Sequence, residues 1–512
     1  DFHYQARNGL RFPGRQSDLY SWPVRSWPTV YLPPVGRTSH PTLHLFDSYQ
    51  RTLVPVSKDR FTSYICGITP YDATHLGHAA TYVAFDLVHR YMHASGAVVR
   101  FVENITDIDD PLFERANRDK IDWTVLAESQ ISLFVSDMTA LHVLPPDHYE
   151  GVVENMDLII GAVQKLIDRG FTYSLDGDLY FDIQRGDTNL AGLPLPLSEA
   201  ISIFRERGGD PERTGKRHPL DALLWRRSNP GEPEWKTTFG DGRPGWHIEC
   251  VALALNYLPY PTESSITLQG GGADLIFPHH ENEIAQSEAA GYGFAKRWMH
   301  NAWVTASGEK MSKSLGNSLQ VHELLKSVRG IELRWYLGSA HYRSMLEFSH
   351  EALAESATAF RRIEGFLQRS VEILGVEPTP VISDAFCDAM NDDLAVPTAL
   401  AGIADALKAG NSAITSGDKK VIAASANEIR GALDVLGCDP FDPAFATEAL
   451  GGDLTAALDG VIKLALAQRT AARERKDFAA SDAIRDGLAA MGITIEDTAQ
   501  GPRWSISRDG RA

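Results

Sequence analysis

The sequence predicts an α/β domain with a parallel sheet, followed by an α-helical bundle and a small C-terminal module. The buried run Thr62–Cys66 is typical of a strand, and apolar residues between 83 and 92 then recur at helical spacing. Val98–Val102 has the pattern of a second strand, so the order strand, turn, helix, strand predicts a βαβ unit. Residues 351–436 alternate small apolar and charged residues at helical period, which is typical of a bundle.

Chain length and local composition predict where the parts begin and end. At 512 residues the chain is too long for one core, and its length favours roughly three or four domains. The stretch 111–180 is mostly helical in pattern, whereas 184–245 is rich in Gly, Pro and charge. We predict an extended N-terminal arm, 1–40; the α/β domain, 41–320, with an inserted connecting region at about 111–245; a junction, 321–350; the bundle, 351–437; a linker, 438–452; and the C-terminal module, 453–512.

Charge and cysteine usage narrow the class of protein. A formal net charge of −18 argues against indiscriminate nucleic-acid binding, although a local basic face can still contact RNA. No apolar run approaches the roughly 18 residues of a membrane span, and residues 1–15 lack the apolar core of a signal peptide. The four cysteines are too widely separated for a disulfide framework, so we expect a cytoplasmic protein without a membrane partner.

Two short motifs carry side chains that suit a nucleotide. His75-Leu-Gly-His78 follows the first strand, where parallel sheets bind ligands and helix amides favour phosphate. Taken alone, this motif is more often a turn with two solvated histidines. Far downstream, the lysines of Lys310-Met-Ser-Lys-Ser314 can clamp a pyrophosphate leaving group while a carboxylate attacks the α-phosphorus. An isolated Lys-x-x-Lys is usually a solvated loop, and the pairing of both motifs is far more specific.

Together the motifs resemble the HIGH and KMSKS signatures of class I aminoacyl-tRNA synthetases. This resemblance implies a Rossmann-like class I catalytic domain that binds ATP with Mg²⁺ and activates an amino acid. It implies catalytic roles for His75, His78, Lys310 and Lys313, of which His75, His78 and Lys313 would bind ATP.

A second set of motifs contains thiol, imidazole and carboxylate groups. By spacing alone, Cys66 and Cys250 are most simply two buried apolar side chains. However, Cys66-Gly-Ile-Thr, Trp246-His-Ile-Glu-Cys250 and Phe277-Pro-His-His-Glu-Asn-Glu283 resemble the zinc site of cysteinyl-tRNA synthetases. The resemblance implies one zinc ion held by Cys66, Cys250, His279 and Glu283, with Trp246 walling a small pocket and His280 and Glu281 in support. Zinc distinguishes the thiolate of cysteine from the hydroxyl of serine better than shape alone.

The same resemblance implies further contacts to the adenylate. These residues are Gly67, Thr69, Thr81, Asn104, Thr106, Gly272 and Asp274. The stretch Asn104–Asp110 has a second interpretation, because Asn, Thr and Asp also favour the cap between a strand and a helix.

The acceptor of the activated cysteine has two candidate classes. Residues 66–81, Glu206–Pro211 and Leu220–Trp225 resemble the related ligase that joins cysteine to glucosaminyl-inositol in mycothiol synthesis. Ala80 also stands where the synthetases commonly carry arginine. Glu206–Pro211 is equally compatible with a flexible connection that either acceptor tolerates.

The C-terminal half resembles the synthetases instead. It continues well beyond the end of the short mycothiol ligases, and Arg473–Arg485 resembles the synthetases' anticodon-recognition module. Basic residues there have the spacing of a phosphate-binding face, although a solvated charged helix fits them equally well; they are Arg469, Arg473, Arg475, Lys476 and Arg485. We therefore predict a monomer that charges tRNA(Cys), with glucosaminyl-inositol as the alternative acceptor. A less favoured alternative is an inactive tRNA-binding relative.

Overall fold

The structure is a computed structural model that divides the chain into two compact units, Asp1–Asp439 and Pro440–Ala512. It describes residues 30, 32, 42–58, 61–72, 74–186, 195–258, 266–306, 309–310, 319–490, 493–498 and 501–506. Most of the arm predicted at 1–40 therefore lies outside the described residues. Among those that are described, no helix has the length and apolarity needed to cross a membrane.

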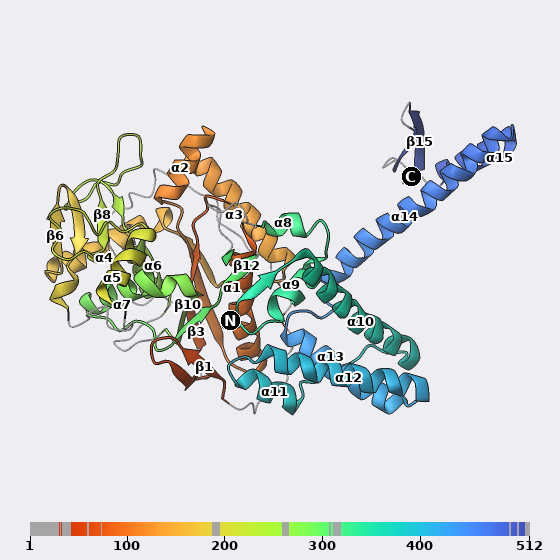
Figure 1. Ribbon diagram of the computed structural model, residues 1–512, viewed down its shortest axis with the longest axis horizontal. Helices are drawn as coiled ribbons and strands as arrows, with labels where there is room; N and C mark the ends of the chain where they lie inside the picture. The colour runs from red at the N-terminus through yellow and green to blue at the C-terminus, as the bar shows by residue number, and fades with distance from the viewer. Residues whose placement is uncertain are drawn as a thin grey trace, which may run out of the picture. The chain divides into compact units, whose positions relative to one another are not determined.

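A five-stranded parallel sheet forms the centre of the first unit (Figure 1). Its strands lie in the order β11 (Trp298–Asn301), β10 (Leu268–Gly272), β3 (Phe61–Ile68), β4 (Val99–Ile105) and β5 (His148–Gly151). The βαβ unit predicted from the sequence is confirmed, with α1 (Leu76–Ala94) joining β3 to β4. Strands β4 and β5 extend the sheet on one side of β3, whereas β10 and β11 extend it on the other side. The strand order therefore reverses between β3 and β10. Open α/β sheets bind ligands at the carboxyl ends of the strands beside such a reversal.

Helices cover both faces of this sheet. Because strand side chains alternate, neighbouring residues of β3 contact different layers. Ser63 Oγ lies 2.8 Å from His89 Nε2 on α1, whereas Tyr64 and Cys66 join a core cluster with residues of α6 (Trp246–Tyr257). In Figure 1, α1 lies on one side of the sheet, and α6 lies on the other with α4 (Met156–Asp168) and α7 (Glu281–Ala289).

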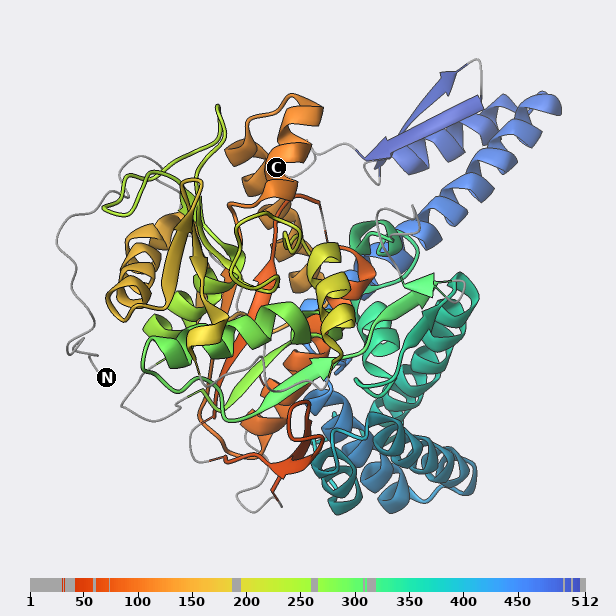
Figure 2. The ribbon, with the colours of Figure 1, turned by 60° about the vertical axis from the view of Figure 1, so that its left-hand side comes forward.

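The insertion differs from the region predicted at 111–245. Strand β5 pairs with β4 in the central sheet, so residues 148–151 belong to the core and not to an insertion. A separate antiparallel sheet follows, visible at one end of the unit in Figure 2. It contains β6 (Thr172–Leu175), β7 (Asp178–Phe181), β8 (Leu223–Arg226) and β9 (Arg243–Pro244). The α-helices between residues 110 and 245 are α2 (Asp110–Asp119), α3 (Trp123–Ala140), α4 and α5 (Leu197–Glu206). The mostly helical pattern expected to residue 180 is wrong for β5 to β7, because strands this short display little alternation.

The junction predicted at 321–350 contains two helices and the last strand of a small three-stranded sheet. Strand β12 (Val304–Ala306) pairs with β13 (Glu309–Lys310) and with β14 (Leu346–Phe348). The helices are α8 (Val321–Leu324) and α9 (Gly330–Gly338), and α9 packs on α1 and α10. An antiparallel hairpin of β1 (His44–Asp47) and β2 (Thr52–Pro55) lies near the start of the described chain.

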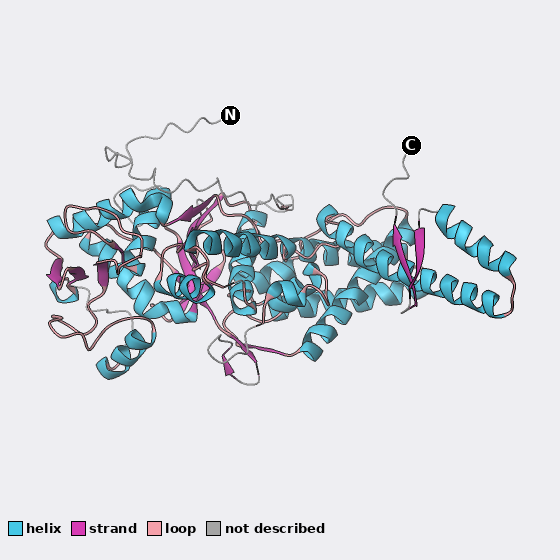
Figure 3. Cartoon of the chain, turned by 90° about the horizontal axis from the view of Figure 1, so that it is seen from above, coloured by secondary structure: helices cyan, strands magenta, loops and turns pink. Residues whose placement is uncertain are grey.

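The predicted helical bundle is confirmed (Figure 3). Its helices are α10 (His350–Leu374), α11 (Asp384–Asn391), α12 (Val396–Ser416) and α13 (Lys419–Val435), with α13 packed against α10 and α12. Ser349 and Ser383 cap α10 and α11 by accepting hydrogen bonds from backbone N–H groups of the first turn.

The second unit contains two helices and a hairpin. These are α14 (Pro443–Glu474), α15 (Phe478–Ala490), β15 (Ile493–Thr498) and β16 (Gly501–Ile506). The linker predicted at 438–452 is shorter than expected, because α14 begins at Pro443. Asp442 caps this helix by accepting from the N–H of Ala444 at 3.0 Å, and a proline at the first position is favourable. The glycines at 451 and 452, which suggested a linker, cost a helix only about 1 kcal/mol each.

Candidate active site

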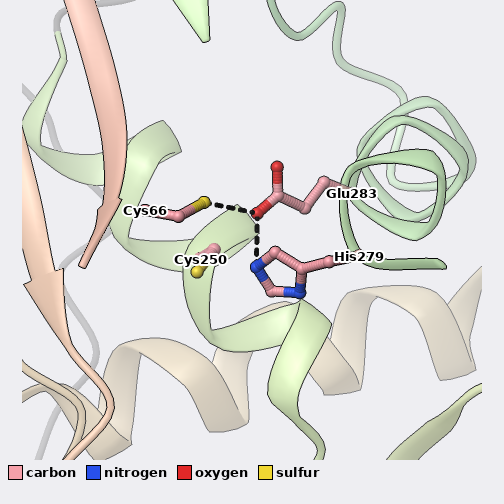
Figure 4. A group of neighbouring side chains, drawn as sticks. All are labelled: Cys66, Cys250, His279 and Glu283. Carbon is pink, nitrogen blue, oxygen red and sulfur yellow. Dashed lines mark hydrogen bonds and ion pairs between the residues drawn. The ribbon is translucent and has the colours of Figure 1, made fainter. Parts of the chain in front are cut away.

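Four potential metal ligands converge at the carboxyl end of β3. Cys66 lies near the end of this strand, Cys250 lies on α6, His279 lies in the turn Ile276–His280, and Glu283 lies on α7. One ligand atom from each lies within 4.8 Å of those of the other three (Figure 4). Glu283 Oε1 is 3.1 Å from His279 Nε2 and 3.5 Å from Cys66 Sγ. The structure thus brings together all four residues that the sequence motifs implied as ligands.

The electrostatics of this cluster favour a bound cation. All four side chains are buried, with exposed fractions of 6% or less. Burial, the thiol of Cys250 and the carboxylate of Glu283 raise the pKa of the Cys66 thiol. Burial also raises the pKa of Glu283 to about 8. Two sulfurs, one imidazole and one carboxylate form a donor set that zinc accepts, and a dication would offset the cost of burying their anionic forms.

Neighbouring side chains orient these four residues. His280 Nε2 lies 3.2 Å from Cys66 Sγ, and its other ring nitrogen lies 2.7 Å from His300 Nε2 on β11. Gln269 Nε2 donates to Glu283 Oε2 at 2.9 Å, and His247 Nδ1 lies 2.8 Å from His279 Nδ1. Such contacts fix the direction in which ligand atoms point.

Three of these supporting residues escaped the sequence analysis. The supporting role implied for His280 fits its contact with Cys66, whereas Gln269, His247 and His300 were not singled out. Gln269 directly precedes the three glycines 270–272, and His247 directly follows Trp246, so proximity to the motifs was the available signal. No sequence pattern pointed to His300.

Trp246 lies between the four-residue cluster and a large cleft. Its ring stacks on the His279 imidazole, with centroids 4.2 Å apart and an interplanar angle of 24°. The same side chain lines a cleft of about 1770 Å³, together with Thr69 and residues of the antiparallel sheet. Trp246 therefore stands where a wall of a small amino-acid pocket is needed.

The first histidine motif forms the start of α1. His75 is the N-cap residue, and its Nδ1 accepts from the N–H of His78 at 3.2 Å. The two imidazole rings are stacked, with centroids 3.7 Å apart. Both rings therefore lie at a helix N-terminus, where the backbone favours phosphate oxygens.

The segment after the lysine motif is attached to this helix start. The N–H of Leu76 donates to the carbonyl of Leu319 at 2.9 Å, and the N–H of Val321 donates to that of Thr74 at 3.1 Å. Lys310 lies on β13, with its backbone paired to Thr305. Lys313 lies outside the described residues. Residues Leu319 and Val321, which follow the lysine motif in sequence, thus lie directly beside the histidine motif.

The remaining implied adenylate contacts surround the ends of β3, β4 and β10. The N–H of Gly67 donates to Asn104 Oδ1 at 2.8 Å, and Asn104 Nδ2 donates to Thr106 Oγ1 at 3.1 Å. A Cβ at position 67 would lie 1.6 Å from the carbonyl oxygen of Asn104, so only glycine fits there. Asp109, not Asn104 or Thr106, caps α2.

The other residues of this set occupy the helix and strand ends nearby. Thr81 Oγ1 donates to the carbonyl of Gly77 at 3.1 Å and accepts from Asn301 Nδ2 at 3.0 Å. Gly272 ends β10, and Asp274 lies in the turn that follows. These positions border the sheet reversal between β3 and β10.

Comparisons with known proteins identify each part of the chain. Residues 52–358 match the model for the class I (C) tRNA synthetase catalytic domain, and residues 385–438 match the DALR domain. Residues 455–504 match the anticodon-binding domain of cysteinyl-tRNA ligases.

Whole-chain relatives agree with these matches. The cysteine–tRNA ligases of Streptomyces avermitilis and Streptomyces griseus are each 44% identical over 471 residues, covering 91% of this chain and 99% of the relative. The methionyl-tRNA synthetase of Mycobacterium tuberculosis, solved with methionyl-adenylate, superposes with a TM-score of 0.54 at 17% identity. That match covers 77% of this chain and 93% of the synthetase, and it confirms the Rossmann-like class I fold. The chain belongs to the cysteine–tRNA ligase family of the class I aminoacyl-tRNA synthetases.

Proposed function

We propose that the chain activates L-cysteine with Mg-ATP and transfers the cysteinyl group to tRNA(Cys). The observation that carries this proposal is the juxtaposition of a thiol-rich ligand cluster with a class I nucleotide motif. Cys66 lies near the carboxyl end of β3, the strand after which the chain leads to His75 and His78. A group that recognises sulfur and a group that recognises phosphate thus meet at one sheet edge.

Cys66, Cys250, His279 and Glu283 would hold a zinc ion. When bound, zinc supplies a thiophilic Lewis acid that binds the sulfur of cysteine far better than the hydroxyl of serine. Trp246 limits the volume beside His279, which favours a small side chain. Gln269 and His280 hold Glu283 and Cys66 in place by the contacts described above.

In the first step, a carboxylate oxygen of cysteine attacks the α-phosphorus of ATP. The bond from that phosphorus to the bridging oxygen breaks, and Mg-pyrophosphate leaves with the electron pair. His75 and His78 would donate to the phosphates from the start of α1, while Lys310 and Lys313 would stabilise the leaving group. Gly67, Thr69, Thr81, Asn104, Thr106, Gly272 and Asp274 would contact the adenylate.

In the second step, the acceptor displaces AMP from the cysteinyl adenylate. A hydroxyl of the terminal ribose of tRNA attacks the acyl carbon and loses its proton as the ester forms. The match of residues 455–504 to an anticodon-binding domain supports tRNA as the acceptor. A small aminosugar acceptor needs neither that domain nor the bundle α10–α13. We further propose that the protein acts as a cytoplasmic monomer.

A side-by-side acceptor assay tests this function. The purified chain is first assayed for cysteine-dependent exchange of pyrophosphate into ATP, and then offered tRNA(Cys) or glucosaminyl-inositol. We expect exchange with cysteine and product only with tRNA. Product only with the aminosugar would refute tRNA as the acceptor, and a folded protein without exchange would refute the activation step.

A further inference from the structure

The motif Glu206–Pro211 has no assigned role in the proposed reaction, yet it lies beside the candidate metal ligands. It follows α5, and α5 packs against the turn Ile276–His280. Arg207 Nη1 donates to the carbonyl of Phe277 at 2.5 Å. Phe277 stands two residues before His279, so this hydrogen bond is made to the backbone that carries a candidate ligand.

A carboxylate near the same turn also acts on the Arg207 guanidinium. Burial lowers the pKa of Arg207, and the negative charges of Asp274 and Glu206 oppose that effect. Asp274 opens the turn that continues into Ile276–His280. Arg207 thus interacts with both consecutive turns, by charge with Asp274 in Ala273–Leu275 and by a hydrogen bond with Phe277 in Ile276–His280.

The rest of the motif explains how the arginine is held in position. Gly208 has a φ of +86°, which L side chains rarely adopt, and a Cβ at Gly209 would lie 2.3 Å from the Phe204 ring. The two glycines therefore let the chain turn tightly against α5, immediately after Arg207. Asp210 then attaches the Gly208–Gly209 turn to the antiparallel sheet, because it accepts from the hydroxyl of Tyr180 on β7. It also accepts from Lys216 Nζ at 2.8 Å.

We propose that Arg207 is a positioning residue that fixes the turn carrying Asp274 and His279, and so sets how His279 faces the cysteine pocket. The inference rests on the proposed function, because it gives His279 a role in holding the metal. Because Arg207 donates to the backbone carbonyl of Phe277, its influence on His279 depends on the position of the turn and not on the side chain of Phe277. The motif is thereby explained without an aminosugar ligand.

The chain offers a matched control two residues away. Arg205 has the same side chain in the last turn of α5, but it is 52% exposed and pairs with Glu212. Arg207→Met keeps the length of the apolar stem and removes both the charge and the hydrogen bond to Phe277. Arg207→Lys keeps the positive charge and an N–H donor that can bond to the carbonyl of Phe277. Arg205→Met makes the same substitution at the exposed arginine that pairs with Glu212.

Two measurements on the full chain test the role. In pyrophosphate exchange, we expect Arg207→Met to raise the KM for cysteine about 10-fold or more with a smaller change in kcat, because a charge-assisted hydrogen bond is lost. Arg207→Lys should recover part of this loss, and Arg205→Met should match the parent. With Co²⁺ loaded in place of zinc, the visible absorption bands of the metal should shift in Arg207→Met and not in Arg205→Met.

The outcomes separate this inference from the proposed function. If the parent exchanges pyrophosphate with cysteine and Arg207→Met matches Arg205→Met in both KM and Co²⁺ spectrum, the positioning role is refuted and the function stands. If the parent shows no exchange but only Arg207→Met shifts the Co²⁺ bands, the function fails and the positioning role stands. Should Arg207→Met fail to fold, Arg207→Lys decides, and parental values for both its KM and spectrum would refute the role.

Discussion

Arg334 on α9 donates to the carboxylate of Asp86 on α1, and both side chains are only 1% exposed. Asp86 also accepts from Arg90 Nε and from the N–H of Leu144, each at 2.8 Å. Arg334 donates further to the carbonyl of Leu436 at 2.9 Å, just after α13. One buried charge network therefore joins α1, the helix that begins at the histidine motif, to the helical bundle.

Breaking this network should destabilise the first unit strongly. Burial disfavours the charge on Asp86, but the guanidinium groups of Arg334 and Arg90 hold its pKa below the usual value. Asp86→Asn would leave two buried guanidinium groups without their carboxylate, at a cost of about 3–5 kcal/mol. We expect a lower midpoint of thermal unfolding at neutral pH. Glu212→Gln, which removes an exposed ion pair with Arg205, should leave the midpoint unchanged; equal midpoints for Asp86→Asn and Glu212→Gln would contradict the account.

The glycine after Cys66 should be indispensable. A Cβ at position 67 would overlap the carbonyl of Asn104, so Gly67→Ala must displace the end of β3 or β4. Overpacking of this kind costs about 1–3 kcal/mol, and the displacement should abolish most cysteine-dependent pyrophosphate exchange. The control is Gly402→Ala on α12, where an added Cβ meets open space. That variant should be slightly more stable, by about 0.5–1 kcal/mol, and fully active. Normal exchange by Gly67→Ala would refute the close approach.

A buried carboxyl on β4 should make stability fall with rising pH. Burial and the charge of Asp86 raise the pKa of Glu103 to about 8. Its Oε2 has no hydrogen-bond partner among the described residues. Because the folded state holds this proton more tightly than the unfolded chain, the stability it contributes is complete below the ordinary pKa of glutamate. It is then lost as pH rises toward 8, with a slope of at most about 1.4 kcal/mol per pH unit.

Glu103→Gln removes this titration and provides the test. The difference in unfolding midpoint between the variant and the parent should grow in favour of the variant from about pH 4.5 to pH 8, and then level off. Thermal unfolding of both proteins across that range measures it. Parallel pH profiles for the two proteins would show that Glu103 is ionised in the folded state.

Removal of the second unit should separate the two steps of the reaction. The chain divides after Asp439, and the network around Arg334 lies wholly within the first unit. A chain ending at Asp439 should keep cysteine-dependent pyrophosphate exchange but lose tRNA charging by about 100-fold, equivalent to about 3 kcal/mol of tRNA binding. Equal losses of exchange and charging would indicate that the second unit serves only to stabilise the first.

Local patterns predicted the βαβ unit and the bundle because both depend on residues close in sequence. The strand before Gly67 and the period of α1 are visible within short windows. The antiparallel sheet of the insertion was missed, since its strands contain only two to four residues each. The prediction placed a linker where α14 begins, because it gave more weight to Gly451 and Gly452 than to the Asp442 cap. In the structure Asp442 caps the helix, and both glycines lie within it.

The site itself was predictable only through resemblance of short motifs. Spacing offers no reason to bring Cys66 and Cys250 together, and each alone fits a buried apolar role. The supporting contacts are harder still to foresee. Gln269 on β10 reaches Glu283 on α7, and Arg207 reaches Phe277 from another part of the chain. Such pairs follow from tertiary packing, which no helical or strand period encodes.

The most direct test of the account measures metal content together with the choice between cysteine and serine. We expect purified protein to contain one zinc ion per chain and to exchange pyrophosphate with cysteine but not with serine. Chelation should abolish the exchange and added zinc should restore it, while Cys250→Ser and Glu283→Gln should lower both zinc content and exchange. Metal-free protein that activates cysteine and serine equally well would contradict the central claim that Cys66, Cys250, His279 and Glu283 select cysteine through a metal.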